Sequence, residues 1–269
     1  MEKVIGFIGC GNMGRAIIGG LVKSEKVKAK NIIASDFSER GLKSCEEEFG
    51  IRTALRDNLK IAKESDILVL SVKPNVYKNV IDEIKNEVKE NVIIVTIAAG
   101  ISIDFVEKAF EKDIKIIRTM PNTAALVSES VTAMCRNCNI TDGDFEEVKN
   151  LLTSIGMVEE VSEKLIDGII AVSGSSPAYM YMFLEALGDG GVLSGLPRDK
   201  AYRMAAQAML GSAKMFLETG KHPGELKDMV CSPGGTTIEA VRYLEKNGFR
   251  SAVIEAMVKC IEKSQDMNK

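Results

Sequence analysis

Histidine and tryptophan are nearly missing from this chain of 269 residues, which contains one histidine, His222, and no tryptophan. A single histidine disfavours Ser–His–Asp hydrolysis, histidine-based general acid catalysis and a histidine-rich metal centre. His222 stands directly before a proline, which favours a structural role for it. We therefore expect chemistry that does not depend on a protein imidazole.

An excess of positive charge is also missing. The chain has 35 basic and 38 acidic residues, so it lacks the surplus of Lys and Arg with which proteins neutralise nucleic-acid phosphates. Its most apolar stretches, such as residues 178–184, fall well short of the roughly 20 residues that a membrane span needs. The first residues show no secretory signal. We expect a cytoplasmic protein with neither nucleic acid nor a membrane as its partner.

Clusters of metal ligands are missing too. Cys135 and Cys138 form a C-x-x-C pair, but no second pair of Cys or His follows at the spacing of a zinc site. The pair ends a strand-like run at residues 131–134 and does not open a helix as a redox pair does. Without a secretory signal, the six cysteines are expected to stay reduced. We expect no metal.

The residues that are present form two halves with different patterns. In residues 1–161, short β-rich runs alternate with helical stretches such as 39–49 and 76–88. The runs cover residues 4–8, 32–34, 67–72, 92–97 and 114–117. Runs that are apolar throughout suit a parallel sheet covered on both faces. The alternation is typical of a doubly wound α/β domain of the Rossmann type.

Beyond residue 161 the strand pattern stops, and residues typical of helix starts and helix ends follow. Pro177 and Pro197 stand at predicted helix starts, whereas Gly220 and Gly248 stand at predicted helix ends. We predict an all-helical domain over residues 162–269, joined to the α/β domain over residues 1–161 without a flexible linker.

The predicted helix over residues 177–194 is apolar nearly all round, and such a helix is buried on most sides. Gly188, Gly190 and Gly191 would let another backbone come close. A domain of roughly 108 residues rarely surrounds such a helix alone. This favours a homodimer or larger homo-oligomer built through the C-terminal helices. The alternative is a central helix buried within a monomer.

The first predicted strand leads directly into Gly9-Cys10-Gly11-Asn12-Met13-Gly14, and a helical pattern follows. G-x-G-x-x-G in this context predicts dinucleotide binding. The first glycine permits the turn, the second lets the backbone approach the pyrophosphate, and the third lets the helix pack on the strand. The start of the helix, with Asn12 and Met13, offers free N–H groups to the phosphates.

Asp36 stands at the end of the second predicted strand, where an acidic residue binds the ribose 2′-hydroxyl. A carboxylate there repels the 2′-phosphate of NADPH, which favours NADH, although Arg40 is close enough to compensate in part. The alternative is that Asp36 only caps the helix that begins near Ser38.

Further cofactor contacts are expected at the carboxyl ends of other strands. These ends are Val72-Lys73-Pro74, Ala98-Ala99-Gly100 and Thr119-Met120-Pro121-Asn122, and each could line the nicotinamide. Lys73 could equally be a solvated lysine in front of a helix.

Residues 232–237, Ser-Pro-Gly-Gly-Thr-Thr, open a predicted helix. Thr236 and Glu239 have the spacing of a capping box, which is the structural interpretation. In the functional interpretation, the free N–H groups, the two threonine hydroxyls and the two glycines form a cradle for a substrate carboxylate. The residues alone leave both interpretations open.

Several of these segments resemble the pyrroline-5-carboxylate reductases. They are residues 6–14, 71–74, 118–123, 173–179 and 228–237, which follow the family's order over almost the whole chain. The last segment is specific to the family, whereas the glycine motif is shared with many dehydrogenases. The resemblance implies reduction of the cyclic imine of 1-pyrroline-5-carboxylate to L-proline by NAD(P)H, the last step of proline biosynthesis. It also implies a C-terminal helical domain that interleaves with a partner subunit.

The resemblance assigns roles to single residues as well. It places the substrate carboxylate on Ser232, Gly235, Thr236 and Thr237, places Glu163 near the substrate, and matches Asn58, Val72, Lys73 and Ala99 to cofactor-contacting positions. Thr237, the one catalytic candidate, would orient the ring nitrogen of an imine that solvent has already protonated, so no histidine is needed. NADPH-preferring members often have a small polar residue where this chain has Asp36.

Two other functions compete with this one. A β-hydroxyacid dehydrogenase would share the glycine motif and the two-domain plan, but it needs a catalytic lysine in the first long helix of the second domain. Residues 177–193 contain no lysine. A non-catalytic dinucleotide sensor would have no use for a carboxylate cradle, and an activity assay separates it from an enzyme.

Overall fold

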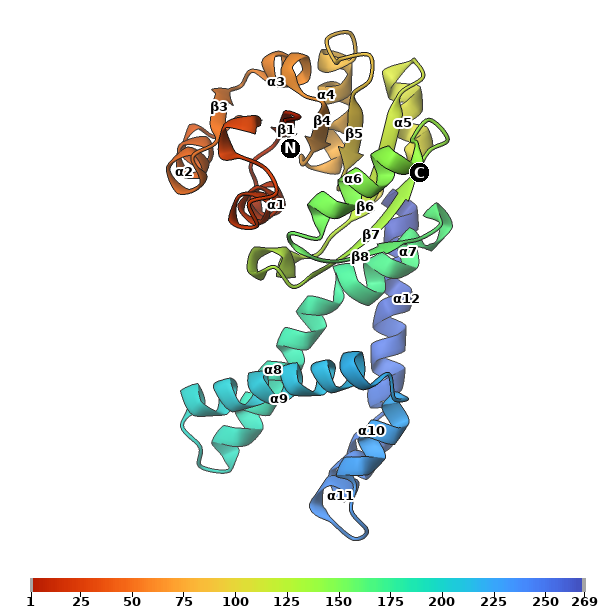
Figure 1. Ribbon diagram of the computed structural model, residues 1–269. Helices are drawn as coiled ribbons and strands as arrows, with labels where there is room; N and C mark the ends of the chain where they lie inside the picture. The colour runs from red at the N-terminus through yellow and green to blue at the C-terminus, as the bar shows by residue number, and fades with distance from the viewer. Residues whose placement is uncertain (1, 268–269) are drawn as a thin grey trace. The chain divides into compact units, whose positions relative to one another are not determined.

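The computed structural model describes residues 2–267, which form two compact units (Figure 1). The first unit contains the residues up to Ser175 together with those from Cys260 onward, and the second contains Ser176–Lys259. The last strand ends at Glu160, close to the predicted domain boundary at 161/162. The compact units divide later in the sequence because Ile166 and Ile170 are buried in the core of the first unit.

The first unit is built on a sheet of eight strands in the order β3-β2-β1-β4-β5-β6-β7-β8. Their bounds are β1 (Ile5–Ile8), β2 (Ile32–Asp36), β3 (Arg52–Leu55), β4 (Ile67–Leu70), β5 (Ile93–Thr96), β6 (Lys115–Met120), β7 (Ser130–Arg136) and β8 (Gly156–Glu160). Neighbouring strands are parallel except β6 and β7, which are antiparallel. The predicted doubly wound Rossmann-type sheet is confirmed.

Helices cover both faces of this sheet. They are α1 (Asn12–Lys23), α2 (Glu39–Phe49), α3 (Asn58–Glu64), α4 (Tyr77–Ile84), α5 (Ile103–Phe110), α6 (Asp142–Leu152) and α7 (Ile166–Ile169). Short helical turns join them: η1 (Ala29–Asn31), η2 (Pro74–Val76), η3 (Thr123–Val127), η4 (Glu163–Leu165) and the π-helical η5 (Ile170–Gly174).

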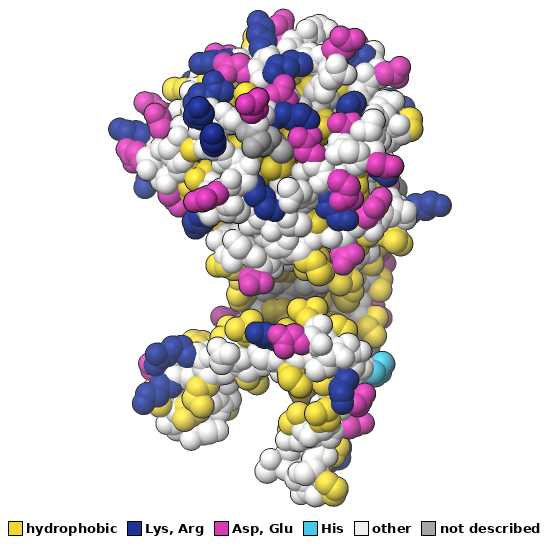
Figure 2. Space-filling model, in the orientation of Figure 1, with side chains coloured by type: hydrophobic (Ala, Val, Ile, Leu, Met, Phe, Trp, Pro, Cys, Tyr) yellow, Lys and Arg dark blue, Asp and Glu magenta, His cyan; other side chains and the backbone are white. Residues whose placement is uncertain are grey.

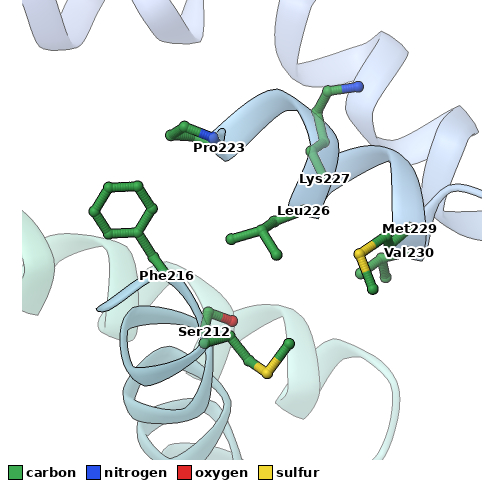
Figure 3. A pocket seen from close by; sticks show the side chains of 8 residues that line it. Ser212, Phe216, Pro223, Leu226, Lys227, Met229 and Val230 are labelled. Carbon is green, nitrogen blue, oxygen red and sulfur yellow. The ribbon is translucent and has the colours of Figure 1, made fainter. Parts of the chain in front are cut away.

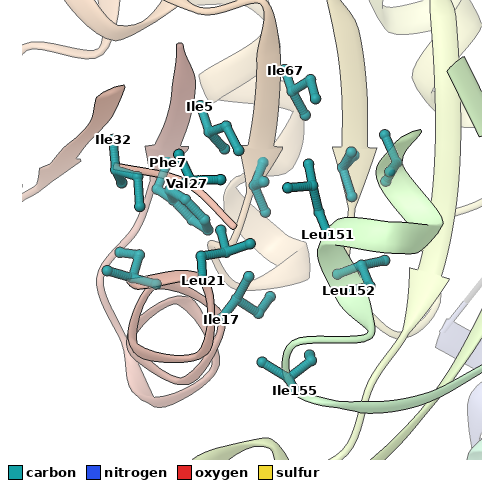
Figure 4. Packing of buried hydrophobic residues seen from close by; sticks show 14 of the residues in the cluster. Ile5, Phe7, Ile17, Leu21, Val27, Ile32, Ile67, Leu151, Leu152 and Ile155 are labelled. Carbon is teal, nitrogen blue, oxygen red and sulfur yellow. The ribbon is translucent and has the colours of Figure 1, made fainter. Parts of the chain in front are cut away.

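Alternate strand residues divide the core into two layers. Ile5 and Phe7 of β1 face α1 and α6, where they pack with Ile17 and Leu151 (Figure 4). Ile8 of the same strand belongs to the opposite layer, with α3, α4 and α5. The period of two expected for strands thus builds a sheet buried on both sides.

The second unit is helical, as predicted. It contains α8 (Ser176–Leu193), α9 (Arg198–Thr219), α10 (Pro223–Val230), α11 (Thr236–Lys246) and most of α12 (Phe249–Met267). The glycines of α8 do bring another helix close, because a Cβ atom on Gly188 would stand 2.2 Å from the ring of Tyr202 on α9.

The apolar surface of α8 is not covered within this chain. Tyr181 is 64% exposed and Met182 is 68% exposed. The buried residues of the second unit are Gly188 and Ala201. Figure 2 shows hydrophobic side chains gathered on these helices and charged side chains spread over the first unit. No helix within residues 2–267 has the length and apolar character to cross a bilayer.

Candidate functional site

The loop between β1 and α1 has the geometry that its glycines predicted. Gly9 has a φ of +102°, and a Cβ atom there would stand 2.5 Å from the carbonyl oxygen of Ser71. A Cβ on Gly14 would stand 2.5 Å from the carbonyl oxygen of Gly9, whereas one on Gly11 would meet nothing within 4 Å. Gly9 and Gly14 therefore shape the loop, and Gly11 leaves it open to a ligand.

The start of α1 is free to bind an anion. Its N-cap residue is Gly11, and no side chain accepts a hydrogen bond there from the first turn. Asn12 and Met13 follow as the first two helical residues. Free N–H groups and the positive end of the helix suit the pyrophosphate of a dinucleotide, so the residues present fit this cofactor.

Two side chains fasten the glycine loop to neighbouring strands. The Ser71 hydroxyl donates a hydrogen bond to the carbonyl oxygen of Gly9 at 2.6 Å. The N–H of Cys10 donates to Oδ2 of Asp36 at 2.6 Å, and the N–H of Ser38 donates to Oδ1 at 2.8 Å. Asp36 thus holds the loop as well as the start of α2, which Ser38 itself caps through the N–H of Gly41.

A groove of about 340 Å³ opens beside this loop. Six predicted cofactor residues line it: Gly9, Gly11, Asp36, Asn58, Val72 and Lys73. The sequence did not single out the others, which are Ile8, Ser35, Phe37, Ser71, Val76 and Val80. Ser71 carried a signal, because it is the first polar residue after the buried strand β4.

Asn58 is fixed inside this groove. It is buried at the first position of α3, where its Oδ1 accepts a hydrogen bond from the Ser35 hydroxyl and its Nδ2 donates to Glu83 at 2.8 Å. The other predicted cofactor residues do not line the groove itself. Asn12, Met13 and Gly14 are in the first turn of α1, Pro74 opens η2, and Ala98 and Ala99 follow β5.

Two buried thiols interact here, Cys10 of the loop and Cys45 of α2. A hydrogen bond to Cys45 on α2, together with burial, raises the pKa of Cys10. The same hydrogen bond lowers the pKa of Cys45 to about 7. All six cysteines are free, and no three His, Cys, Asp or Glu residues of the described chain are grouped to hold a metal ion.

Glu163 lies at the start of η4 in the first unit. Its Oε1 accepts hydrogen bonds from the N–H of Ile103 and from the Arg118 guanidinium, both at 2.8 Å. The Arg118 side chain is only 5% exposed. Glu163 is therefore held beside the first turn of α5 by a buried cation.

The segment before α11 does not form the capping box that the spacing of Thr236 and Glu239 suggested. The N-cap is Gly235 and makes no side-chain hydrogen bond, while Thr236 is already the first helical residue. Glu239 pairs instead with Arg242. That part of the structural interpretation is wrong, because Gly234, at a φ of +66°, turns the chain so that Gly235 takes the cap position.

This helix start is presented openly in the second unit. Ser232 and Thr236 are exposed and Thr237 is half-buried. A Cβ on Gly235 would stand 2.4 Å from the Ser232 hydroxyl oxygen, so a side chain at residue 235 would displace that hydroxyl from its present position next to the N-cap. His222 lies elsewhere, at the start of α10, where its Nδ1 accepts a hydrogen bond from the N–H of Gly224 at 3.0 Å. This supports the structural role predicted for His222.

A second hollow, of about 450 Å³, lies between α9 and α10 (Figure 3). Phe216 and Leu226 point into it from the two helices, and Met229 and Val230 close one side. Its lining offers few polar groups to orient a reacting molecule. We regard it as part of the uncovered apolar surface of the second unit.

Comparison with known proteins gives matches over the full chain. Residues 163–267 match the family model "Pyrroline-5-carboxylate reductase dimerisation", and residues 4–100 match "NADP oxidoreductase coenzyme F420-dependent". The pyrroline-5-carboxylate reductase of Escherichia coli strain K12 is 50% identical over 269 residues, 100% of each chain. That of Methanosarcina acetivorans is 42% identical, over 100% of this chain and 99% of its own.

Solved structures agree. The pyrroline carboxylate reductase of Plasmodium falciparum, with NADP bound, superposes with a TM-score of 0.91 at 32% identity, covering 100% of both chains. A pyrroline-5-carboxylate reductase from Coxiella burnetii gives the same TM-score, identity and coverage.

Proposed function

This chain belongs to the pyrroline-5-carboxylate reductase family, and from that premise we propose that it reduces 1-pyrroline-5-carboxylate to L-proline with NAD(P)H. The setting we propose is the last step of proline biosynthesis in the cytoplasm. The observation that carries the proposal is the uncapped start of α11, since a glycine N-cap with no side-chain acceptor leaves its N–H groups for a ligand carboxylate.

We place the substrate on the residues around this helix start. The carboxylate would accept hydrogen bonds from the first N–H groups of α11 and from the hydroxyls of Ser232 and Thr236, with Gly235 allowing close approach. Thr237 would hydrogen-bond the ring nitrogen. Glu163, in the first unit, is a further proposed substrate residue, and its second carboxylate oxygen remains available because the hydrogen bonds from Ile103 and Arg118 go to Oε1.

The proposed reaction needs little acid–base catalysis by the protein. The imine can take its proton from solvent before it binds, so it arrives as an electrophilic iminium. When bound, NAD(P)H supplies the hydride. Thr237 then serves to orient the ring, since a threonine hydroxyl is a poor acid near neutral pH. This agrees with the structural use of the one histidine.

For the cofactor we propose residues on both sides of the glycine loop. The pyrophosphate would lie over Gly9, Gly11 and the first turn of α1, with Asn12, Met13 and Gly14. Asn58, Val72 and Lys73 would line its path, and Pro74, Ala98 and Ala99 would bound the nicotinamide end.

We further propose a preference for NADH. Asp36 is a fixed negative charge on the groove, and a carboxylate there repels a 2′-phosphate. Purified enzyme should show a higher kcat/KM with NADH than with NADPH, and Asp36→Ser should narrow or reverse the ratio. Asp36→Asn is the matched control, because it removes the charge but keeps one oxygen to hold the loop. A strong native preference for NADPH would contradict this proposal.

We propose that a second copy of the chain covers the apolar faces of α8, α9 and α10. The support is the exposure of Tyr181 and Met182 on α8, together with the match of this region to a dimerisation family. Sedimentation at micromolar protein concentration should show a dimer or larger, and a stable, active monomer would refute this assembly.

The reaction is tested by following reduced-nicotinamide absorbance after pyrroline-5-carboxylate is added. Loss of absorbance with formation of proline is the expected result. Binding of NADH without turnover would indicate a dinucleotide sensor. Turnover of a β-hydroxyacid in place of the imine would indicate a dehydrogenase of the competing type.

A further inference from the structure

Asp36 does more in this structure than face a ribose. Both of its carboxylate oxygens accept hydrogen bonds from backbone N–H groups, Oδ2 from Cys10 at 2.6 Å and Oδ1 from Ser38 at 2.8 Å. Two such donors hold the carboxylate in one position. The negative charge at the groove is therefore a structural part of the glycine loop, and the chain cannot remove it to admit a 2′-phosphate.

A cationic residue, Arg56, is hydrogen-bonded to the backbone of Asp36 and Phe37. β3 runs parallel to β2 with Leu55 opposite Asp36, so Arg56 is the first residue beyond the paired strands. The N–H of Arg56 donates to the carbonyl oxygen of Asp36 at 3.2 Å. Its Nε donates to the carbonyl oxygen of Phe37 at 3.4 Å. Asp36 and Phe37 both line the groove, so these two bonds hold Arg56 next to two of its lining residues, although Arg56 does not line the groove itself.

The backbone does not call for arginine at this position. Arg56 has a φ of +55°, in the left-handed region where glycine and asparagine are favoured. The turn after β3 would form more easily with either of those residues. Contacts of the arginine side chain, and not the backbone conformation, therefore favour arginine at this position. The remaining N–H donors of its guanidinium have the planar arrangement that binds phosphate.

We propose that Arg56 is a specificity-determining residue that binds the 2′-phosphate of NADPH and offsets its repulsion by Asp36. Arg40, on the following helix, and Arg56 are both exposed, but Arg56 is tied through its side chain to the carbonyl oxygen of Phe37, the residue directly after Asp36. The chain then uses both cofactors, with a narrower preference for NADH than Asp36 alone would impose. This inference rests on the proposed NAD(P)H-dependent function.

Calorimetric titration of the full-length protein with 2′,5′-ADP and with 5′-AMP tests the proposal, because the two probes differ only in the 2′-phosphate. Arg56→Ala should weaken binding of 2′,5′-ADP by about 10- to 150-fold, the usual range for a hydrogen bond to a charged group. Binding of 5′-AMP should change by less than about 2-fold. In steady-state assays of Arg56→Ala, kcat/KM should be lower than in the native protein with NADPH and unchanged with NADH.

Three further variants sharpen the result. Arg56→Gly removes the strain of the positive φ, and it should weaken binding of 2′,5′-ADP as much as Arg56→Ala does. Because glycine suits this backbone conformation, weaker binding in this variant would not result from a folding defect. Arg56→Lys keeps the positive charge but not the planar guanidinium, so it should weaken binding of 2′,5′-ADP less than Arg56→Ala does. Arg52→Ala is the matched control, since Arg52 is an exposed arginine on β3, the strand that precedes Arg56, and its guanidinium pairs with Glu64 at 2.6 Å.

Equal losses for 2′,5′-ADP and 5′-AMP in the Arg56 variants would overturn the proposal. So would an Arg52→Ala variant that loses 2′,5′-ADP as strongly as Arg56→Ala. Nucleotide binding is measured without the imine substrate. Failure of the proposed reaction would therefore leave the titrations interpretable, and failure of the titrations would leave the reaction intact.

Discussion

In the first unit, sheet and helices bury their apolar side chains within one chain, whereas in residues 176–259 only Gly188 and Ala201 are buried. The contrast extends to the two helix starts that we assign to ligands. The loop before α1 is held by hydrogen bonds with Ser71 and Asp36, whereas Ser232 and Thr236 at the start of α11 are exposed. The first unit therefore forms its cofactor groove within one chain, while the second unit exposes its apolar surface and the segment that we propose binds the substrate.

The largest expected effect comes from a charge introduced on the exposed face of α8, and it tests whether a second copy covers that face. Met182→Glu would bury an unpaired carboxylate when a second copy covers that face, and should raise the dissociation constant of the assembly by about 100-fold or more. Sedimentation velocity over a range of concentrations measures it. Lys30→Glu, a larger change of charge on the first unit, should leave assembly unaltered. Equal effects of the two variants would contradict the assignment of the interface.

Thr237→Ala should produce the next largest effect. Loss of one oriented hydrogen bond to a partly charged group lowers kcat/KM by about 10- to 150-fold. Thermal stability should be unchanged. The affinity for NADH should also be unchanged, since the cofactor groove belongs to the first unit. Kinetics, melting temperature and cofactor titration on one preparation measure all three. Full activity in this variant would remove Thr237 from the site.

A buried hydroxyl in the first unit gives a smaller effect, on stability alone. Tyr77 is fully buried, and its hydroxyl donates to the carbonyl oxygen of Leu70 at 2.5 Å. Tyr77→Phe should lower the free energy of unfolding by about 1–3 kcal/mol. Tyr243→Phe, at a residue of the second unit that is 62% exposed, should stay within about 0.5 kcal/mol. Chemical denaturation compares them, and equal losses would show that the assembly buries Tyr243.

The smallest expected difference compares two helix starts. Ser102 caps α5 by accepting a hydrogen bond from the N–H of Phe105 at 3.1 Å, so Ser102→Ala should cost about 1 kcal/mol. Thr236 is not a cap, so Thr236→Ala should cost less than about 0.5 kcal/mol. Denaturation midpoints distinguish the two values. A loss of about 1 kcal/mol in Thr236→Ala would restore the capping interpretation.

The parts of the fold that follow from local patterns could be predicted from sequence. β1 and β4 are apolar throughout, and β5 is apolar except for its last residue, Thr96, because both faces of the sheet are covered. Each of the three strands was expected within a few residues of its place. β3 and β8 were not expected. They are the two edge strands of the sheet, and their mixed polar sequences follow from pairing on one side only.

The candidate site divides in the same way. The glycine loop depends on residues that are adjacent in sequence, and its geometry agrees with the motif. Arg56 could not be found in this way, because its contact with Asp36 depends on the register between β2 and β3. The cap of α11 was misplaced for a related reason: the capping-box spacing was present, but the conformation of Gly234 shifts the helix start by one residue.

The return of α12 to the first unit has a consequence for how the chain is put together. The thiol of Cys260 donates a hydrogen bond to the hydroxyl oxygen of Ser175 at 3.2 Å, so the chain leaves the first unit and re-enters it at one place. Ser264, only 5% exposed, donates to Asp167 at 2.8 Å a turn further on. The second unit is thus an insertion with adjoining ends. Its helices can lengthen or diverge without rebuilding the sheet, while the final helical turns are a structural component of the nucleotide-binding unit.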